Sequence, residues 1–260
     1  MSLIEQAITA LIPMLIAAII FWLISLIKKD VSIVDSLWSL LFIIAALTIV
    51  SYQEAISDRA VVVMGLVIVW GLRLSIHITI RHWGHEEDHR YKLIRNNNQP
   101  GFSYKSLYLI FGFQTLAAWV IALPLYYSIN SVAPLNILDL LAVMLWTVGM
   151  FFESVSDYQL SRFKSNPENS GKVFTGGLWK YSRHPNYFGE CLIWWGFFVF
   201  ALSDYAYLSI ISPLLMTFLL LKFSGVSVLE KTMKSKPGYE SYMKQTNAFI
   251  PGLTGRKGEL

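Results

Sequence analysis

Charged and polar side chains are concentrated between Gly176 and Glu190, directly before and at the start of a strongly apolar segment. The two glycines that open this stretch permit a tight turn, and Pro185 suits the first turn of a helix because its missing N–H is not needed there. Arg183 and His184 would then flank the N-terminus of that helix. The partial positive charge of a helix N-terminus, together with these two side chains, favours binding of a phosphate or another anion.

The helix that begins at Pro185 would carry a polar face, because Gly189 and Glu190 follow Asn186 at spacings of three and four. Side chains at such spacings lie on one side of a helix. A polar face at the start of an apolar helix fits a polar cofactor held at a membrane surface. The alternative is that the preceding Arg-His pair only binds lipid headgroups.

A second stretch, His85-Glu86-Glu87-Asp88-His89, matches the H-E-x-x-H pattern of zinc peptidases. In that pattern two histidines one helical turn apart bind the metal, and the glutamate activates water. Both variable positions are acidic here, and the stretch lies in a connection beside the membrane. A solvated histidine cluster that includes His82 is the simpler interpretation. We therefore expect no metal site and keep a membrane metalloprotease as the second alternative.

The composition is that of an integral membrane protein. The chain has 260 residues, of which 55% are hydrophobic and only 15% charged, whereas soluble domains carry about 25% charged residues. Its mean hydropathy is +0.50. A helix needs about 20 apolar residues to cross a bilayer, and we predict an all-α protein with seven such spans, at about 3–27, 32–50, 60–81, 105–129, 135–157, 186–203 and 205–222.

The basic residues outside these spans lie in alternate connections, and only Arg59 falls on the opposite side. By the positive-inside rule the N-terminus is outside and the C-terminus cytoplasmic. This bias explains the net charge of +4 and the pI near 9.0, so neither indicates nucleic-acid binding. We expect a single domain over 1–260, with the cytoplasmic cofactor-binding part mainly in 81–104, 157–190 and 222–251.

Ionisable and polar residues within the spans are the next candidates, because such groups are costly in hydrocarbon and usually face a bundle interior or a cavity. Asp35 lies about one turn into the second predicted span. The others are Arg73, His77, Gln114, Glu153, Asp157, Glu190 and Glu230. The alternative for each is a buried polar group that a neighbouring helix satisfies.

Five stretches of the chain carry the motifs of one enzyme family. They are Thr175–Glu190, Ser156–Leu160, Pro237–Tyr242 with Phe249–Pro251, Ile33–Trp38 and Trp83–Tyr91. The first three resemble the C-terminal domain of the steroid 5α-reductases, and the last two resemble the bacterial members of that family. The resemblance spans most of the chain and is most specific over 156–190.

This resemblance implies a seven-span reductase that binds NADPH from the cytoplasmic side and reduces the C=C bond of a 3-oxo-Δ4-steroid or a similar conjugated lipid enone. Such chemistry needs a hydride donor, a group that polarises the carbonyl oxygen and a proton source. If the chain follows the family pattern, Asn and Asp side chains would hydrogen-bond the amide and ribose hydroxyls of NADPH, and Arg and Lys side chains would bind its phosphates. The expected cofactor residues are Asp157, Lys164, Lys172, Arg183, His184, Asn186 and Glu190, with Arg81, Arg90 and Arg95 as further phosphate ligands.

The polarising acid is assigned by topology. Animal steroid reductases use a Gln-Glu pair with a tyrosine, and this chain contains Gln53-Glu54, but that pair falls in an outer loop. We therefore place the role on Asp35, near the cytoplasmic end of the same span, with Tyr91 as its partner. A carboxyl in an apolar bundle has a raised pKa and can donate a hydrogen bond to a carbonyl.

The principal alternative is a membrane methyltransferase of the isoprenylcysteine type. That family shares the Arg-His-Pro stretch and a C-terminal Glu, Tyr-x-x-Tyr, Ile-Pro arrangement, here Glu230, Tyr239, Tyr242 and Ile250-Pro251. Its cofactor, S-adenosylmethionine, has no phosphates, so the basic residues between 162 and 183 favour NADPH. A non-enzymatic lipid-binding or scaffold role is a further alternative. The expected partners are a lipid enone and membrane lipids, with no nucleic acid and no obligate protein partner, in a bacterial inner membrane.

Overall fold

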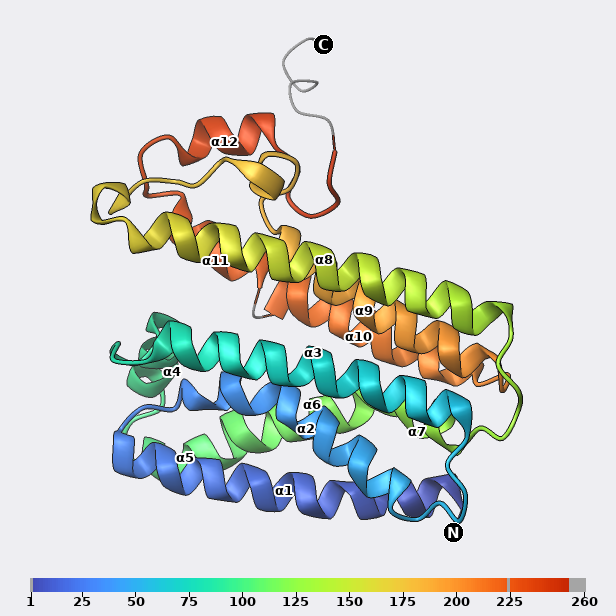
Figure 1. The fold of residues 1–260 in the computed structure, drawn as a ribbon. Coiled ribbons are helices and arrows are strands. Elements are labelled where there is room, and N and C mark those ends of the chain that lie inside the picture. The colour runs from blue at the N-terminus through green and yellow to red at the C-terminus, as the bar shows by residue number, and fades with distance from the viewer. Residues whose placement is uncertain (1, 224, 253–260) are drawn as a thin grey trace. The chain divides into compact units, whose positions relative to one another are not determined.

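The computed structural model describes residues 2–223 and 225–252. Within these ranges the chain is helical and contains no strand, and its one β-type contact is an isolated bridge between Ser182 and Asn247. The predicted all-α class is therefore confirmed. The chain divides into two compact units, one formed by 1–136 with 201–209 and the other by 137–200 with 210–260 (Figure 1).

The first unit is built on three long helices, α1 (Leu3–Lys28), α2 (Ile33–Val50) and α3 (Asp58–His82). α2 packs against both of the others. A capping box between Ser2 and Glu5 begins α1, which satisfies backbone N–H groups that the helix leaves free. After α3 the chain forms α4 (His89–Asn97), the short helix that carries Arg90 and Tyr91.

A bent helical segment completes the helices of this unit. It consists of α5 (Phe102–Ser106), the π-helical turn η1 (Leu107–Gly112), α6 (Phe113–Ile121) and α7 (Leu123–Asn130). The bend before α7 is 42°. Pro124 lies in the first turn of α7, where it has no N–H to continue the preceding helix. The predicted span 105–129 is thus bent rather than straight.

A buried arginine ties distant connections of the first unit together. Arg59, in the first turn of α3, is fully buried and donates to Ser131 and to the backbone oxygen of Pro134 (3.0 Å). Its guanidinium also lies 3.7 Å from the carboxylate of Asp204. This explains why 201–209 belong to the first unit. Arg59, the one basic residue predicted on the outer side, therefore holds these connections together.

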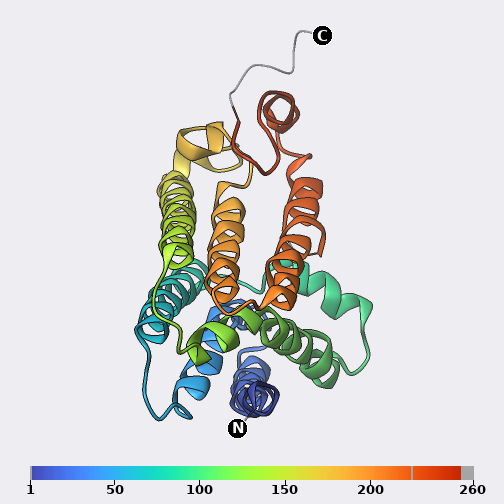
Figure 2. The same ribbon diagram turned by 90° about the vertical axis from the view of Figure 1, so that its right-hand side faces the viewer.

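The second unit contains α8 (Ile137–Ser165), the 3₁₀ turns η2 (Pro167–Asn169) and η3 (Gly177–Lys180), α9 (Pro185–Leu202), α10 (Ile211–Phe218), η5 (Leu219–Phe223), α11 (Val226–Met233) and α12 (Tyr239–Gln245). A further 3₁₀ turn, η4 (Tyr207–Ile210), lies where the units join along the chain. Figure 2 shows α8, α9 and α10 beside one another. A Cβ atom on Gly189 would lie 2.5 Å from the Gly149 oxygen, so these glycines permit close packing of α8 and α9.

Four helices among the described residues are long and apolar enough to cross a membrane: α1, α2, α3 and α8. The bent segment from Phe102 to Asn130 raises the number to five if it is one span. This confirms an integral membrane protein. The predicted spans at 186–203 and 205–222 correspond to α9 and to the shorter apolar helix Tyr207–Phe223. The number seven and the orientation of the termini stay predictions.

Candidate functional site

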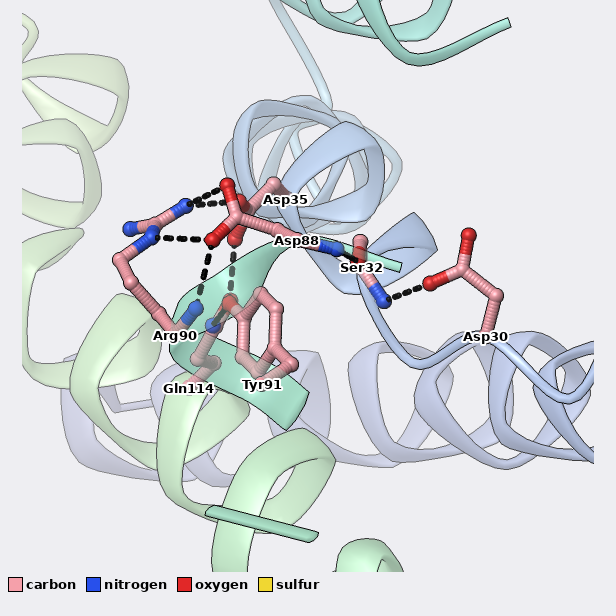
Figure 3. A network of polar contacts seen from close by, with 7 residues as sticks. All are labelled: Asp30, Ser32, Asp35, Asp88, Arg90, Tyr91 and Gln114. Carbon is pink, nitrogen blue, oxygen red and sulfur yellow. Dashed lines mark hydrogen bonds and ion pairs between the residues drawn. The ribbon is translucent and has the colours of Figure 1, made fainter. Parts of the chain in front are cut away.

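A polar cluster in the first unit joins the two residues expected to carry the chemistry (Figure 3). The Tyr91 hydroxyl donates to Asp35 Oδ1 at 2.5 Å, and it accepts a hydrogen bond of 3.1 Å from Gln114 Nε2. Arg90 contacts the other Asp35 oxygen at 2.9 Å. Side chains from α2, α4 and the bent segment thus meet at one phenol oxygen.

The acidic run before α4 positions this cluster. Glu87 accepts from Arg95 at 2.7 Å and from the Val31 N–H at 3.0 Å, which fastens the loop to the turn before α2. The Asp88 N–H donates to Ser32 Oγ at 2.8 Å (Figure 3). Asp88 also caps α4 by accepting from the Arg90 N–H, as an N-cap residue does. The loop is therefore held at the start of α2, and Tyr91 lies against Asp35.

The charge of Asp35 affects the titration of both of its neighbours. Burial and the neighbouring Asp35 charge hold the pKa of Tyr91 well above its ordinary value of 10.0. Burial alone would lower the pKa of Arg90, but Asp35, Asp88 and Tyr91 together outweigh it and raise that pKa. Asp35 thus has two donors directed at it, a phenol and a guanidinium. Tyr91 is the donor in its hydrogen bond with Asp35, and the predicted role of Asp35 as donor to a substrate carbonyl stays a prediction.

Gln114 was named as a polar residue within a span but not assigned to the site. Its place in the cluster depends on the bent segment between α5 and α7, where a π-helical turn precedes it. A π turn shifts every following side chain relative to a regular helix, and such turns are frequent at functional sites. Sequence spacing alone therefore could not have predicted the contact between Gln114 and Tyr91.

In the second unit Arg183 binds protein groups with three of its nitrogen atoms. Its Nε donates to Glu230 at 2.7 Å, Nη2 lies 2.6 Å from the same carboxylate, and Nη1 donates to the backbone oxygens of Met243 (3.1 Å) and Thr246 (2.5 Å). Arg183 is buried. It therefore fastens the C-terminal segment to the turn before α9, rather than presenting a free fork to phosphate.

His184, beside it, is buried and its ring stacks on Tyr187. Its Nε2 lies 3.5 Å from Glu230. Burial, opposed by Glu230 and aided by Arg183, lowers the pKa of His184 to about 4. The imidazole is thus neutral at physiological pH, so it offers one N–H donor and one acceptor nitrogen but no positive charge.

The predicted polar face of α9 meets α8. Asn186 Nδ2 donates to Asp157 Oδ1 at 3.3 Å, and Trp194 Nε1 donates to Glu190 at 3.3 Å. Asp157 and Glu190 are buried. Asn186 Oδ1 is buried without a hydrogen-bond donor among the described residues. These groups form a polar patch inside the second unit, with an acceptor available for a ligand N–H.

The remaining predicted cofactor residues are scattered. Arg81, Lys164 and Lys172 are exposed, whereas Arg95 is engaged with Glu87. Arg81, Arg90 and Arg95 lie in the first unit, and Asp157, Lys164, Lys172, Arg183, His184, Asn186 and Glu190 lie in the second. Gln53, which was set aside on topology, bonds to Asn130 at 2.7 Å in the first unit.

The H-E-x-x-H stretch does not form the helix that a zinc peptidase requires. His85 to Glu87 lie outside any helix, and α4 begins only at His89. Glu86 is paired with Lys92, and Glu87 with Arg95. Among the residues that the structure describes, no three His, Cys, Asp or Glu side chains are grouped to hold a metal ion.

A family of proteins of unknown function, DUF1295, matches residues 21–246. The chain belongs to the DUF1295 family. This family is related to the steroid 5α-reductases. No solved structure matches the chain.

Individual relatives of this DUF1295 protein differ in how much of the chain they match. An uncharacterized protein of Schizosaccharomyces pombe is 26% identical over 282 aligned positions, covering 93% of this chain and 78% of the relative. The rat 3-oxo-5-alpha-steroid 4-dehydrogenase 1 is 34% identical, but the match covers only 41% of this chain and 39% of the rat protein. A probable O-methyltransferase, ustE of Ustilaginoidea virens, is 46% identical over 44 residues, 17% of this chain and 16% of that protein.

Proposed function

We propose that this DUF1295 protein is a membrane reductase that uses NADPH to reduce the C=C bond of a 3-oxo-Δ4-steroid or a similar conjugated lipid enone. One observation carries the proposal: the buried Tyr91 hydroxyl, held between Asp35 and Gln114, in a chain whose family is related to the steroid 5α-reductases. A fixed phenol is a suitable donor to a ketone oxygen in a water-poor site.

In the proposed reaction the single O–H of Tyr91 turns from Asp35 to the substrate carbonyl oxygen when substrate binds, and it stabilises the negative charge that develops there. Asp35 holds the phenol before substrate arrives, and Arg90 holds Asp35 in place. Gln114 limits rotation of the phenol by donating to its oxygen. When bound, NADPH supplies the hydride that adds to the β-carbon. We assign the proton that completes the α-carbon to water.

The residues of the second unit fit the cofactor in type. The unpaired oxygen of Asn186 can accept the carboxamide N–H, and the buried Asp157 and Glu190 carboxylates suit amide and hydroxyl donors. Lys164 and Lys172 are exposed cations that can meet phosphate oxygens. In this proposal Arg183 acts indirectly, by holding the C-terminal segment against the turn that precedes α9. We further propose that the basic connections face the cytoplasm, which in a bacterium places the protein in the inner membrane.

The test uses purified protein in detergent with NADPH and a Δ4-3-ketosteroid. We expect NADPH-dependent formation of a product heavier by two hydrogens, and about 10²- to 10³-fold slower formation in Tyr91→Phe. The matched control is Tyr108→Phe, because Tyr108 is an exposed tyrosine of the same unit. NADPH binding without any reduction across a panel of enones would contradict the proposal. Because one short match is to a probable O-methyltransferase, tight binding of S-adenosylmethionine with no NADPH binding would replace it by the methyltransferase.

A further inference from the structure

We infer that the first unit carries a binding site for the phosphate group of a membrane phospholipid, at the ends of α1 and α3. A cavity of about 540 Å³ opens there, lined by the end of α1, the first turn of α2, the end of α3 and the loop that follows. Lys28, Lys29 and Asp30 line it at the end of α1, and His82 and Trp83 form part of the α3 side. This cavity is separate from the Tyr91 hydroxyl, since neither Asp35 nor Tyr91 lines it.

Three lysines and three carboxylates line the cavity, Asp30 among the carboxylates, and Arg95 beside it adds one further positive charge. Glu87 is neutralised by Arg95 at 2.7 Å, and Glu86 is paired with Lys92. Among the described residues, the ammonium groups of Lys28 and Lys29 have no carboxylate within ion-pair distance. A ligand that enters this cavity therefore meets two lysines against the single remaining carboxylate of Asp30, a net excess of one positive charge, which favours an anionic group.

The position of the cavity favours a lipid as the source of that anion. α1 and α3 are both candidate membrane spans, and their ends at Lys28 and His82 mark a boundary between the apolar and polar parts of the unit. Lys28 Nζ lies 5.6 Å from the centre of the Trp83 ring, and Trp83 is 75% exposed. Tryptophan and lysine are enriched at the level of lipid headgroups.

Apolar surface directly next to the cavity can accept the acyl chains. Ile27 on α1 is 83% exposed, and Ile80 on α3 is 69% exposed. Each precedes a residue of the cavity lining by one or two positions along its helix. A ligand with a phosphodiester and hydrocarbon chains would thus satisfy the lysines and cover these isoleucines, whereas a free phosphate would satisfy only the lysines.

The test is a binding titration of the delipidated full chain with dioleoylphosphatidylglycerol, followed by native mass spectrometry. Lys28→Gln with Lys29→Gln removes both cations, and Lys231→Gln with Lys234→Gln makes the same charge change at exposed lysines of the second unit. Since a lysine near an anionic lipid surface contributes roughly a fivefold change in affinity, we expect the first pair to weaken binding about thirtyfold. The second pair is expected to bind as the unaltered chain does.

Two further arms identify the source of the phosphate and guard against misfolding. Inorganic phosphate and glycerophosphoglycerol, the headgroup without its chains, are titrated against the bound lipid. Thermal unfolding without lipid checks that the lysine variants fold. Equal lipid affinity in all three proteins would overturn the site, and displacement of the lipid by inorganic phosphate or the bare headgroup at comparable concentrations would overturn the lipid as its ligand.

Discussion

The roles assigned to Asp35 and Tyr91 predict a specific pattern in a double-mutant cycle. Tyr91→Phe removes the donor to the carbonyl, and loss of one such donor lowers kcat by about 10²- to 10³-fold. Asp35→Asn keeps an acceptor oxygen of similar size but replaces a hydrogen bond to a charged group by one to a neutral group. The difference is about 1 to 1.5 kcal/mol, so Asp35→Asn is expected to lower kcat about tenfold.

The structure limits side effects of the aspartate change. Arg90 also bonds Asp88, with Nε to Oδ1 at 3.0 Å, so Asp35→Asn leaves that cation with a carboxylate partner. Once Tyr91 is replaced by Phe, there is no hydroxyl donor to the substrate left for Asp35 to position. The double variant is therefore expected to match Tyr91→Phe alone within about twofold, which is a coupling of about 1.4 kcal/mol.

The assay is NADPH oxidation at 340 nm with saturating enone, for the unaltered chain, both single variants, the double variant and Tyr108→Phe. A direct role for Asp35 as the acid would reverse the order of the single variants, with a loss of 10²-fold or more in Asp35→Asn. Fully additive losses would show that the two side chains act independently. Either result refutes Asp35 as the residue that positions Tyr91.

Three other predictions concern the second unit. Arg183→Ala removes the arginine that pairs with the partly buried Glu230 carboxylate, and it is expected to lower the unfolding free energy by about 3 to 5 kcal/mol and to speed proteolysis of the C-terminal segment. Arg162 is exposed, so Arg162→Ala is expected to change neither quantity. The pKa of His184 is about 4 in the folded protein, below its unfolded value of 6.5, so the stability that the neutral imidazole contributes is complete above pH 6.5 and is lost as the pH falls toward 4. Between pH 7.5 and 5 the unfolding free energy of the unaltered chain should therefore fall by about 2 kcal/mol more than that of His184→Gln. Equal falls in the two proteins would refute this. Gly189→Ala places a Cβ atom 2.5 Å from a backbone oxygen of α8 and should lower the unfolding free energy by about 1 to 3 kcal/mol. The control is Gly65→Ala, which should not destabilise the protein because a Cβ atom there would have no other atom within 4 Å.

The long helices were predictable because each is a long apolar run. The first two predicted spans, 3–27 and 32–50, differ from α1 and α2 by one residue at one end. The bent segment was predicted as one span, since hydropathy averages over a window and is insensitive to a π turn or to a 42° bend. Pro124 was the local signal for that bend.

The candidate site was predictable in part. The pairing of Asp35 with Tyr91 was expected, and the structure brings their oxygens to 2.5 Å. The bond from Arg90 to Asp35 was not expected, because Arg90 was assigned to phosphate. Arg183 was likewise assigned to phosphate, but its partners lie 47 to 63 positions further along the chain. Spacing within a motif cannot reveal such partners.

The central claim is that this chain transfers hydride from NADPH to a conjugated lipid enone. Its most direct test is to incubate the purified protein with a Δ4-3-ketosteroid and NADPH in which both hydrogens at C4 of the nicotinamide are deuterium, and to locate the label by mass spectrometry and NMR. We predict one deuterium at the β-carbon of the saturated product, and formation of that product about 10²- to 10³-fold more slowly by Tyr91→Phe. Saturated product without the label, or no saturated product from any conjugated enone tested, would contradict the account.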